Sequence, residues 1–309
     1  MTLILSVATP AYALHVGDRL VSKAGTAYDP LANKSIVFRA TDGLLVLGYT
    51  GPACIDGIPT DTWLAEAAAG GVSLRGGGAV AYGAFSVRDV GSTLIRICEE
   101  LRARRSFERA RGEVSAVGWQ WSAKGRRSLV RDVLWRLDRS SGALRWQQLV
   151  PRHLPERKRV FRMVGTGDWP FSRPTWQLLL DRVGAAGPDW QATERLLLHA
   201  IRDAHAVRPG TIGPHCMSIL LRPWLFPNAL VRFLPLAPHR GTASGEVLEV
   251  AYTPWMVAAD AVHAPAILVG GMTCEQGLLT YSLNAPPIPA GQKLRGALQA
   301  QVRQQRWRP

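Results

Sequence analysis

The chain has 309 residues, of which 47% are hydrophobic, and it carries a formal net charge of +14. It is long enough to bury one large core, and it contains no uncharged run of about eighteen apolar residues, so we expect no membrane-spanning helix. The four cysteines are widely scattered without CxxC spacing, which excludes a disulfide scaffold and suits the reducing cytoplasm. The seven histidines form no ligand pattern, and we therefore expect neither a metal nor another cofactor.

The excess of positive charge admits nucleic acid, an anionic membrane or an acidic protein as a partner. The basic residues are spread along the chain, and the cluster Arg102–Arg111 continues a helical apolar pattern, which favours a solvated helix face. The tail Arg303–Arg308, with Trp307 between two arginines, is the better binding candidate, although a docked C-terminal helix explains it equally well. Nucleic-acid binding is therefore kept only as the weakest alternative, and we expect no membrane partner.

The first fifty residues have the pattern of two β-hairpins. Residues 2–9 are apolar and β-branched, and Tyr12–Ser22 follows as a second strand-like segment. Ser35–Ala40 and Leu44–Thr50 are again typical of strands, and Asp42-Gly43 between them supplies the turn with positive φ that a tight hairpin needs.

The same segment carries the components of a threonine nucleophile. Met1 precedes a small residue, so we expect its removal to leave a free α-amine on Thr2, and this amine can act as base for the Thr2 hydroxyl. Lys34 supplies a cation that lowers the pKa of the amine, and Asp18 is the partner that a buried lysine requires. Gly48, which we expect where a strand becomes a loop, offers an unobstructed backbone N–H to a developing oxyanion.

The rest of the chain alternates between helical and strand-like segments. Capping residues and apolar periodicity predict four helices, at Thr60–Ala69, Ser86–Arg105, Ser172–Val183 and Asp189–Val207, with Thr60 and Asp189 as N-caps. Between them, residues 113–165 predict four strands that form a second sheet. Further strands are predicted at Cys216–Leu221, Leu230–Leu236, Val247–Thr253, Ala266–Val269 and Leu278–Leu283. A proline-rich segment, residues 284–291, then leads to a C-terminal helix, so we divide the chain into a domain at 1–283 and a basic tail at 284–309.

Thr2, Asp18, Lys34 and Gly48, in their frame of strands, resemble the proteasome β-subunit branch of the N-terminal nucleophile (Ntn) hydrolases, as a divergent bacterial-type member. In that family the threonine nucleophile, the aspartate, the lysine and the oxyanion glycine fall at these same offsets. The resemblance implies an α+β fold: a four-layer αββα sandwich of two mainly antiparallel sheets. It also implies a threonine-type peptidase that needs no cofactor, acts on a peptide or protein and assembles as a homo-oligomer, in some cases a ring.

Two later threonines extend the resemblance. The family carries Gly-Ser-Gly beside the nucleophile, and here Gly165-Thr166-Gly167 keeps a hydroxyl able to bond the terminal amine. The family also carries an acid and a serine before the strand at Cys216–Leu221, but this chain has no acid there, and Thr211 is the remaining candidate hydroxyl. The missing acid keeps alive a second reading, a catalytically silent subunit of the same fold.

The register of the family further implies that four small or apolar residues line the first substrate pocket and favour medium apolar side chains; they are Val21, Ala32, Val46 and Thr50.

Each residue of the set also has an ordinary explanation. Threonine is common at the second position, Asp18 beside Arg19 can form a surface pair, and Gly48 can be a turn glycine. Lys34 stands out because only five of the 37 basic residues are lysines, and the pKa and compact charge of lysine are what this chemistry requires.

A secretory signal is the rival explanation of the N-terminal segment. Residues 3–13 end in Ala-x-Ala, and cleavage after Ala13 would remove Thr2 altogether. The segment lacks a basic n-region, and its apolar core is interrupted by polar residues and Pro10, so we favour a strand.

Overall fold

The computed structural model describes most of the chain. The described residues are 2–23, 26–29, 32–74, 80–82, 87–104, 107, 112–124, 127–138, 144–149, 152–154, 159–167, 170–222, 229–236, 247–248, 250–258, 261–265, 267–269, 272–275, 278–281 and 293–294. The expected proline-rich linker and the division of the chain at residue 283 lie outside these residues. The expected C-terminal helix, residues 294–307, also lies outside them except for Leu294, which is in a two-residue strand instead.

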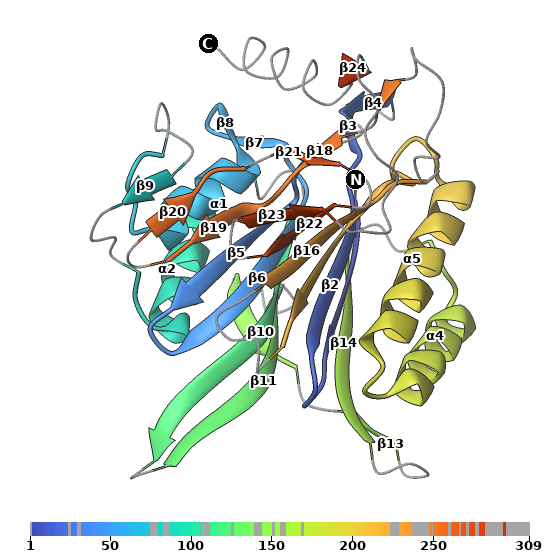
Figure 1. Cartoon of the computed structure of the whole chain (residues 1–309), viewed down its shortest axis with the longest axis horizontal. Coiled ribbons are helices and arrows are strands. Elements are labelled where there is room, and N and C mark those ends of the chain that lie inside the picture. Colours follow the sequence, from blue (N-terminus) through green and yellow to red (C-terminus); the bar gives the residue numbers. More distant parts are fainter. Residues whose placement is uncertain are drawn as a thin grey trace.

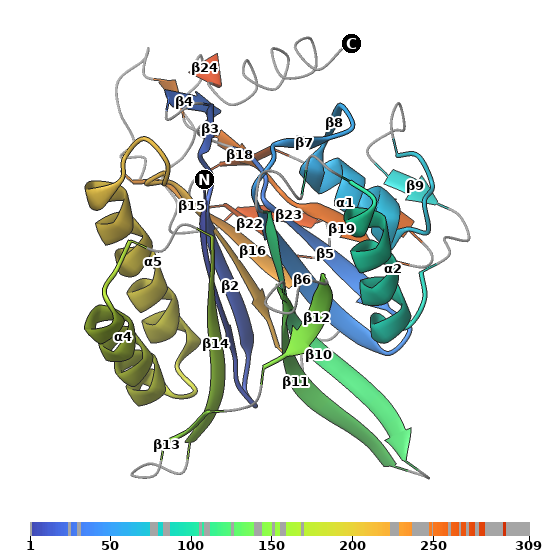
Figure 2. The ribbon, with the colours of Figure 1, turned by 180° about the vertical axis from the view of Figure 1, so that it is seen from behind.

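The molecule is a sandwich of two sheets between two pairs of helices (Figure 1). Helices α4 and α5 cover the outer face of one sheet, and helices α1 and α2 cover the outer face of the other. The view from behind shows the same order of layers (Figure 2). The predicted four-layer αββα fold with mainly antiparallel sheets is confirmed.

The first sheet has eight strands and begins the chain. Its neighbouring strands pair antiparallel. In spatial order they are β13 (Arg152–Leu154), β14 (Arg159–Gly167), β1 (Leu3–Ala8), β2 (Ala13–Asp18), β15 (Cys216–Leu221), β16 (Ala229–Leu234), β22 (Met272–Glu275) and β23 (Leu278–Tyr281).

The second sheet also has eight strands, and its neighbours are antiparallel except for β5 and β19, which run parallel. In spatial order the strands are β12 (Arg145–Gln148), β11 (Arg127–Asp138), β10 (Glu113–Lys124), β6 (Gly43–Thr50), β5 (Ser35–Ala40), β19 (Trp255–Val257), β20 (Ala261–His263) and β9 (Val80–Tyr82). Four short pairs lie outside the large sheets: β3 (Val21–Lys23) with β4 (Thr26–Asp29), β7 (Cys54–Ile55) with β8 (Ile58–Pro59), β17 (Val247–Leu248) with β24 (Lys293–Leu294), and β18 (Val250–Tyr252) with β21 (Ile267–Val269).

Three of the four helices in the described part of the chain begin at a residue whose side chain caps the first turn. Asp89 accepts the Ser92 N–H before α2 (Val90–Arg102), and Ser172 and Asp189 play the same part before α4 (Arg173–Ala186) and α5 (Trp190–Val207). Helix α1 (Thr60–Ala68) differs from the prediction, because Pro59 occupies the N-cap position and makes no side-chain cap. Thr60 is instead the first helical residue, and its hydroxyl donates to the Pro52 carbonyl at 2.7 Å.

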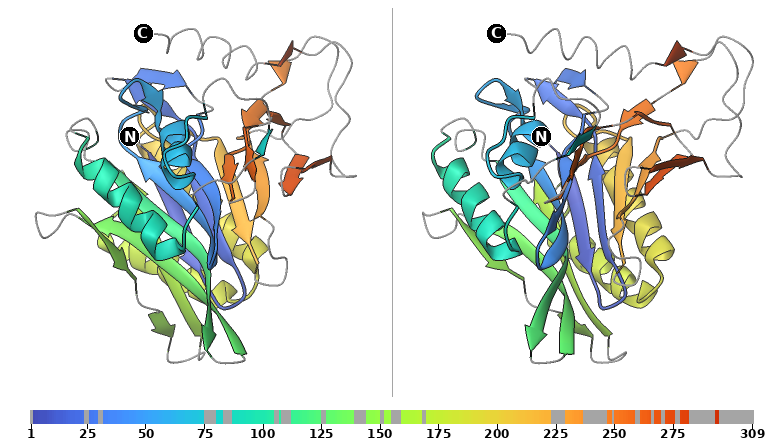
Figure 3. Two further views of the ribbon diagram at one scale, coloured as in Figure 1. Left: turned by 90° about the vertical axis from the view of Figure 1, so that its left-hand side faces the viewer. Right: turned by 60° about the vertical axis from the view of Figure 1, so that its left-hand side comes forward.

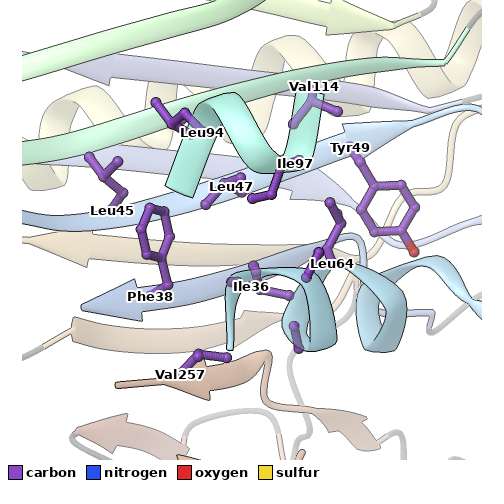
Figure 4. Packing of buried hydrophobic residues seen from close by; sticks show 14 of the residues in the cluster. Ile36, Phe38, Leu45, Leu47, Tyr49, Leu64, Leu94, Ile97, Val114 and Val257 are labelled. Carbon is purple, nitrogen blue, oxygen red and sulfur yellow. The ribbon is translucent and has the colours of Figure 1, made fainter. Parts of the chain in front are cut away.

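Three apolar cores lie between the layers, and strand alternation assigns side chains to them. In β1, Leu3, Leu5 and Val7 face α4 and α5. In β6, Leu45 and Leu47 face α1 and α2, where they pack with the helix residues drawn in Figure 4, whereas Val46 faces the other sheet. The space between the sheets therefore receives the alternate residues of β1, β2, β6 and β10.

The two predicted hairpins are present, but they belong to different sheets. Strands β1 and β2 pair in the first sheet, and β5 and β6 pair in the second. The strands predicted after residue 113 also divide, because β10 to β12 extend the second sheet beside β6 while β14 pairs with β1. The prediction of a separate sheet there is wrong, since hydrogen bonding to the two existing hairpins leaves fewer unpaired edges.

The C-terminal strands lie together at one side of the sandwich (Figure 3). Strand β19 was not predicted, and it adds to β5 in parallel with Trp255 opposite Ile36. Its three residues are too short a pattern to be recognised in a sequence. This segment thereby comes next to residues 32–35, which border the candidate site.

Candidate active site

Three of the predicted site residues meet at one end of the two central hairpins. Thr2 immediately precedes β1, Asp18 ends β2, and Lys34 immediately precedes β5. All three are buried, with exposed fractions of 5%, 1% and 6%. Both sheets therefore contribute to the cluster, because β1 and β2 belong to one and β5 to the other.

Lys34 joins the members of this cluster. Its Nζ donates to Thr2 Oγ1 at 2.6 Å and to Asp18 Oδ2 at 3.1 Å, and it also donates to the Leu20 carbonyl oxygen. An ammonium group has three protons, so each of them has an acceptor. Burial lowers the pKa of Lys34, and the adjacent Asp18 carboxylate opposes that shift. The cation is thus held against the Thr2 hydroxyl itself.

Asp18 is held by backbone groups from three segments. Its Oδ1 accepts the Leu3 N–H at 2.8 Å, and its Oδ2 accepts the Leu20 N–H at 3.0 Å and the Gly213 N–H at 2.9 Å. These N–H groups and the Lys34 ammonium together donate hydrogen bonds to both carboxylate oxygens. Asp18 therefore links the start of β1, the loop after β2 and the approach to β15.

Gly48 lies within β6, opposite Ser35 on one side and Ser115 on the other, and the strand continues to Thr50. Because β6 continues for two residues beyond Gly48, the expectation that the strand becomes a loop at Gly48 is wrong. Its small size has another cause, because a Cβ there would lie 2.1 Å from His15 Cε1 and 3.1 Å from Ile4 Cδ1. The close approach of the imidazole therefore requires glycine.

His15, the neighbour of Gly48, had no predicted role. It is buried between the sheets, and its Nδ1 lies 3.0 Å from the hydroxyl of Ser6 on the neighbouring strand. Burial lowers the pKa of His15 to about 3, so the ring is neutral at physiological pH. In the sequence, His15 is recognisable only as a histidine within an apolar strand, and its spacing is not that of a metal ligand.

Thr166 lies in β14 opposite Ile4 and is fully buried. Its Oγ1 has no hydrogen-bond partner among the described residues. The next residue, Gly167, has φ of 101°, and a Cβ there would lie 1.9 Å from the Thr2 carbonyl oxygen. The Gly165–Gly167 segment is thus in direct contact with the backbone of Thr2.

Thr211 is half-buried, and its hydroxyl lies 3.4 Å from the Arg208 carbonyl oxygen, after the end of α5. The contact between this segment and the cluster comes from the backbone of Gly213, two residues later. A Cβ at Gly213 would lie 2.7 Å from the Leu20 Cβ, which explains the glycine. The sequence drew attention to the right segment, but the backbone donor could not be recognised from residue type.

A buried polar network extends from the cluster to the C-terminal segment. Arg19 Nη2 donates to Asn33 Oδ1 at 2.9 Å and to the Tyr252 carbonyl at 3.4 Å. Asn33 Nδ2 donates to the Thr253 carbonyl at 2.8 Å, and the Tyr49 hydroxyl donates to the Asn33 carbonyl at 2.9 Å. The residue after Asp18 and the residue before Lys34 are therefore held by a segment that lies more than 200 residues later in the chain.

The expected substrate-pocket residues are mostly enclosed. Ala32 and Val46 have no exposed surface, and Val46 packs in the core between the sheets. Thr50 is 4% exposed, and Val21 is partly exposed. The expectation that Ala32 and Val46 line a substrate pocket is therefore wrong, because sheet alternation directs the Val46 side chain toward the opposite sheet.

Within the described ranges, no group of three or more histidine, cysteine, aspartate or glutamate side chains is placed to hold a metal ion. No described helix is both long and apolar enough to cross a membrane.

No protein-family model and no curated protein matches the sequence. Among solved structures, the chain is similar to Anbu from Hyphomicrobium sp. strain MC1, with 12% identity, a TM-score of 0.44 and coverage of 71% of this chain and 82% of that chain. Anbu (ancestral beta-subunit) from Yersinia bercovieri has 11% identity and a TM-score of 0.42, with coverage of 71% of this chain and 81% of that chain. A chain from the helical assembly of the Anbu complex from Pseudomonas aeruginosa has 13% identity and a TM-score of 0.44, with coverage of 71% of this chain and 81% of that chain. At these values, the roles of the site residues are inferred from their own contacts.

Proposed function

We propose that the protein is a threonine-type N-terminal nucleophile amide hydrolase, a proteasome-like peptidase that acts through Thr2. The observation that carries this proposal is the placement of the buried Lys34 ammonium, which bonds both the Thr2 hydroxyl and the Asp18 carboxylate. A cation held against a hydroxyl favours its ionised form, and the fixed carboxylate keeps that cation in place.

The proposed reaction begins after removal of Met1, which gives Thr2 a free amine. Thr2 Oγ attacks the substrate carbonyl carbon, and the hydroxyl proton passes to the Thr2 amine. We assign the stabilisation of the negative charge on the carbonyl oxygen to the Gly48 N–H on the family resemblance alone, because Gly48 is paired on both sides within β6. The C–N bond then breaks, the leaving amine takes up the proton, and water hydrolyses the resulting ester on Thr2.

Thr166 has a supporting role in this proposal. Its buried Oγ1 lacks a partner among the described residues, and its segment contacts the Thr2 backbone. A free Thr2 amine offers the hydrogen-bond partner that this hydroxyl lacks, since buried polar groups are nearly always paired. Thr211 has a weaker claim, because the nearest contact from its segment to the cluster is the Gly213 N–H.

Intact mass spectrometry with a β-lactone tests the proposal. Ring opening by a hydroxyl adds the whole reagent, so we expect a protein that has lost Met1 and gained one lactone mass on Thr2. Thr2→Ala should take up no label, whereas Thr175→Ala, at an exposed position on α4, should react like the wild type. Retention of Met1, or label that survives in Thr2→Ala, would refute the proposal.

The second candidate is a catalytically silent subunit of the same fold. It is favoured by the segment Arg208–Ile212, which contains no acid. A correctly trimmed Thr2 that takes up no label and cleaves no peptide would support it. In either case we infer a homo-oligomer, as the family resemblance implies, located in the cytoplasm, which the scattered cysteines favour. Analytical ultracentrifugation would measure its mass.

A further inference from the structure

Glu113 is a carboxylate near Thr2 to which the mechanism above assigns no role. It is the first residue of β10 and lies opposite Thr50, the last residue of β6. Its Oε2 accepts the N–H of Gly167, at the end of β14, at 2.8 Å. A charged side chain of the second sheet therefore reaches across to the first sheet beside the nucleophile.

Gly167 connects this carboxylate to Thr2. A Cβ on Gly167 would lie 1.9 Å from the Thr2 carbonyl oxygen and 2.8 Å from Thr50 Cγ2. Glu113 therefore acts on Thr2 indirectly: it is hydrogen-bonded to Gly167, and Gly167 packs against Thr2. Lys34 contacts the side chain of Thr2, whereas Gly167 contacts its backbone.

The charges around Thr2 leave a role for an anion in addition to Asp18 and Asp29. Lys34 and Arg19 are buried cations, and a free Thr2 amine would add a third positive group, against the Asp18 carboxylate. Asp29 acts on Lys34 from the β4 segment, and His15 on β2 is neutral because its pKa is about 3. Segment 208–212 contributes no acid. Glu113 supplies the additional negative charge from β10.

We propose that Glu113 is a positioning residue for the Thr2 amine, holding the Gly165–Gly167 segment against Thr2 and balancing the positive charge of the site. This inference rests on the proposed function. The hydrogen bond to Gly167 N–H fixes the strand that presents Thr166, and the negative charge favours the protonated amine. Glu113 thereby opposes Lys34, which favours the neutral amine.

The two effects can be separated by substitution. Glu113→Gln keeps an oxygen that accepts the Gly167 N–H but removes the charge, so the Thr2 amine should become neutral at lower pH. Glu113 acts across one intervening residue, and a unit charge about 10 Å away at an effective dielectric constant of about 20 shifts a pKa by roughly one unit. Glu113→Ala removes both the charge and the hydrogen bond.

The experiment measures the rate of Thr2 acylation by a β-lactone from pH 5 to 9, by intact mass. We expect Glu113→Gln to keep the high-pH rate within about threefold and to move the midpoint down by roughly one pH unit. Glu113→Ala should show the same shift and a high-pH rate about tenfold lower. The matched control is Glu66→Gln, because Glu66 also accepts a backbone N–H, that of Leu74 at 2.9 Å, from helix α1; it should change neither quantity.

An unchanged midpoint in Glu113→Gln, or an equal shift in Glu66→Gln, would overturn this inference. A second measurement, NMR titration of the ¹³C-methylated terminal amine, is independent of acylation. A lower amine pKa in Glu113→Gln supports the role of Glu113 even if no lactone reacts, an outcome that would refute only the proposed function. An equal amine pKa in wild type and variant would refute the role of Glu113.

Discussion

Replacing Gly48 by alanine tests the close contact between this residue and His15. The added methyl carbon would lie 2.1 Å from His15 Cε1, although carbon atoms pack best at about 3.5–4.0 Å. The ring or the strand must therefore move by about 1.5 Å. The ring cannot turn aside easily, because it is buried between the sheets and its Nδ1 is bonded to Ser6.

Overpacking of this kind costs about 1–3 kcal/mol, and the rigid surroundings place Gly48→Ala near the upper value. For a chain of 309 residues, about 3 kcal/mol corresponds to a Tm lower by roughly 5 °C. Urea unfolding gives the free energy of unfolding directly, and the rate of reaction with a β-lactone shows whether the displaced strand changes the reactivity of Thr2.

Two further variants identify the source of the loss. Gly17→Ala is the matched control, because its Cβ would approach the same ring only to 3.8 Å and Ile4 Cγ1 to 3.3 Å, and we expect a cost of about 1 kcal/mol or less. In a double-mutant cycle, Gly48→Ala combined with His15→Ala should be about 2 kcal/mol more stable than the sum of the single variants. Additive effects, or a Gly48→Ala protein as stable as the wild type, would refute the steric explanation.

Two other predictions concern buried polar groups. Thr166→Val should slow acylation of Thr2 about tenfold, because the Thr166 hydroxyl, which has no partner among the described residues, is proposed to bond the Thr2 amine. Loss of that one hydrogen bond should lower the free energy of unfolding by only about 1 kcal/mol; an unchanged acylation rate, or a loss of stability large enough to explain slower acylation, would argue against this role. For His15, the pKa in the folded protein is about 3, below its ordinary value of 6.5, so between these pH values the unfolded chain binds one more proton than the folded protein. The contribution of His15 to the free energy of unfolding is therefore fully present above pH 6.5 and is lost as the pH falls toward 3. This single group should contribute a slope of about 1.4 kcal/mol per pH unit between pH 4 and 6, and His15→Gln should remove it; an identical slope in the variant would show that other groups are responsible.

The sequence allowed the local parts of the structure to be predicted. The hairpins at the N-terminus follow from strand pattern and turn residues, and the contacts among Thr2, Asp18 and Lys34 follow once both hairpins end at the same place. Contacts between sheets were not predictable. The approach of His15 to Gly48 and the bond from Glu113 to Gly167 depend on how two sheets stack, which no periodicity within one strand records.

The clamp from Arg19 and Asn33 to the carbonyls of Tyr252 and Thr253 has a consequence for the order of events during synthesis. The ribosome makes Thr2 first, but the segment that completes its surroundings is made some 250 residues later, roughly 10–50 s afterwards. Until then, Arg19 and Asn33 lack those two acceptors, and β5 lacks its parallel neighbour β19. During most of translation, Thr2 of the nascent chain therefore lacks these surroundings, and a chain truncated before residue 250 cannot form the contacts described here.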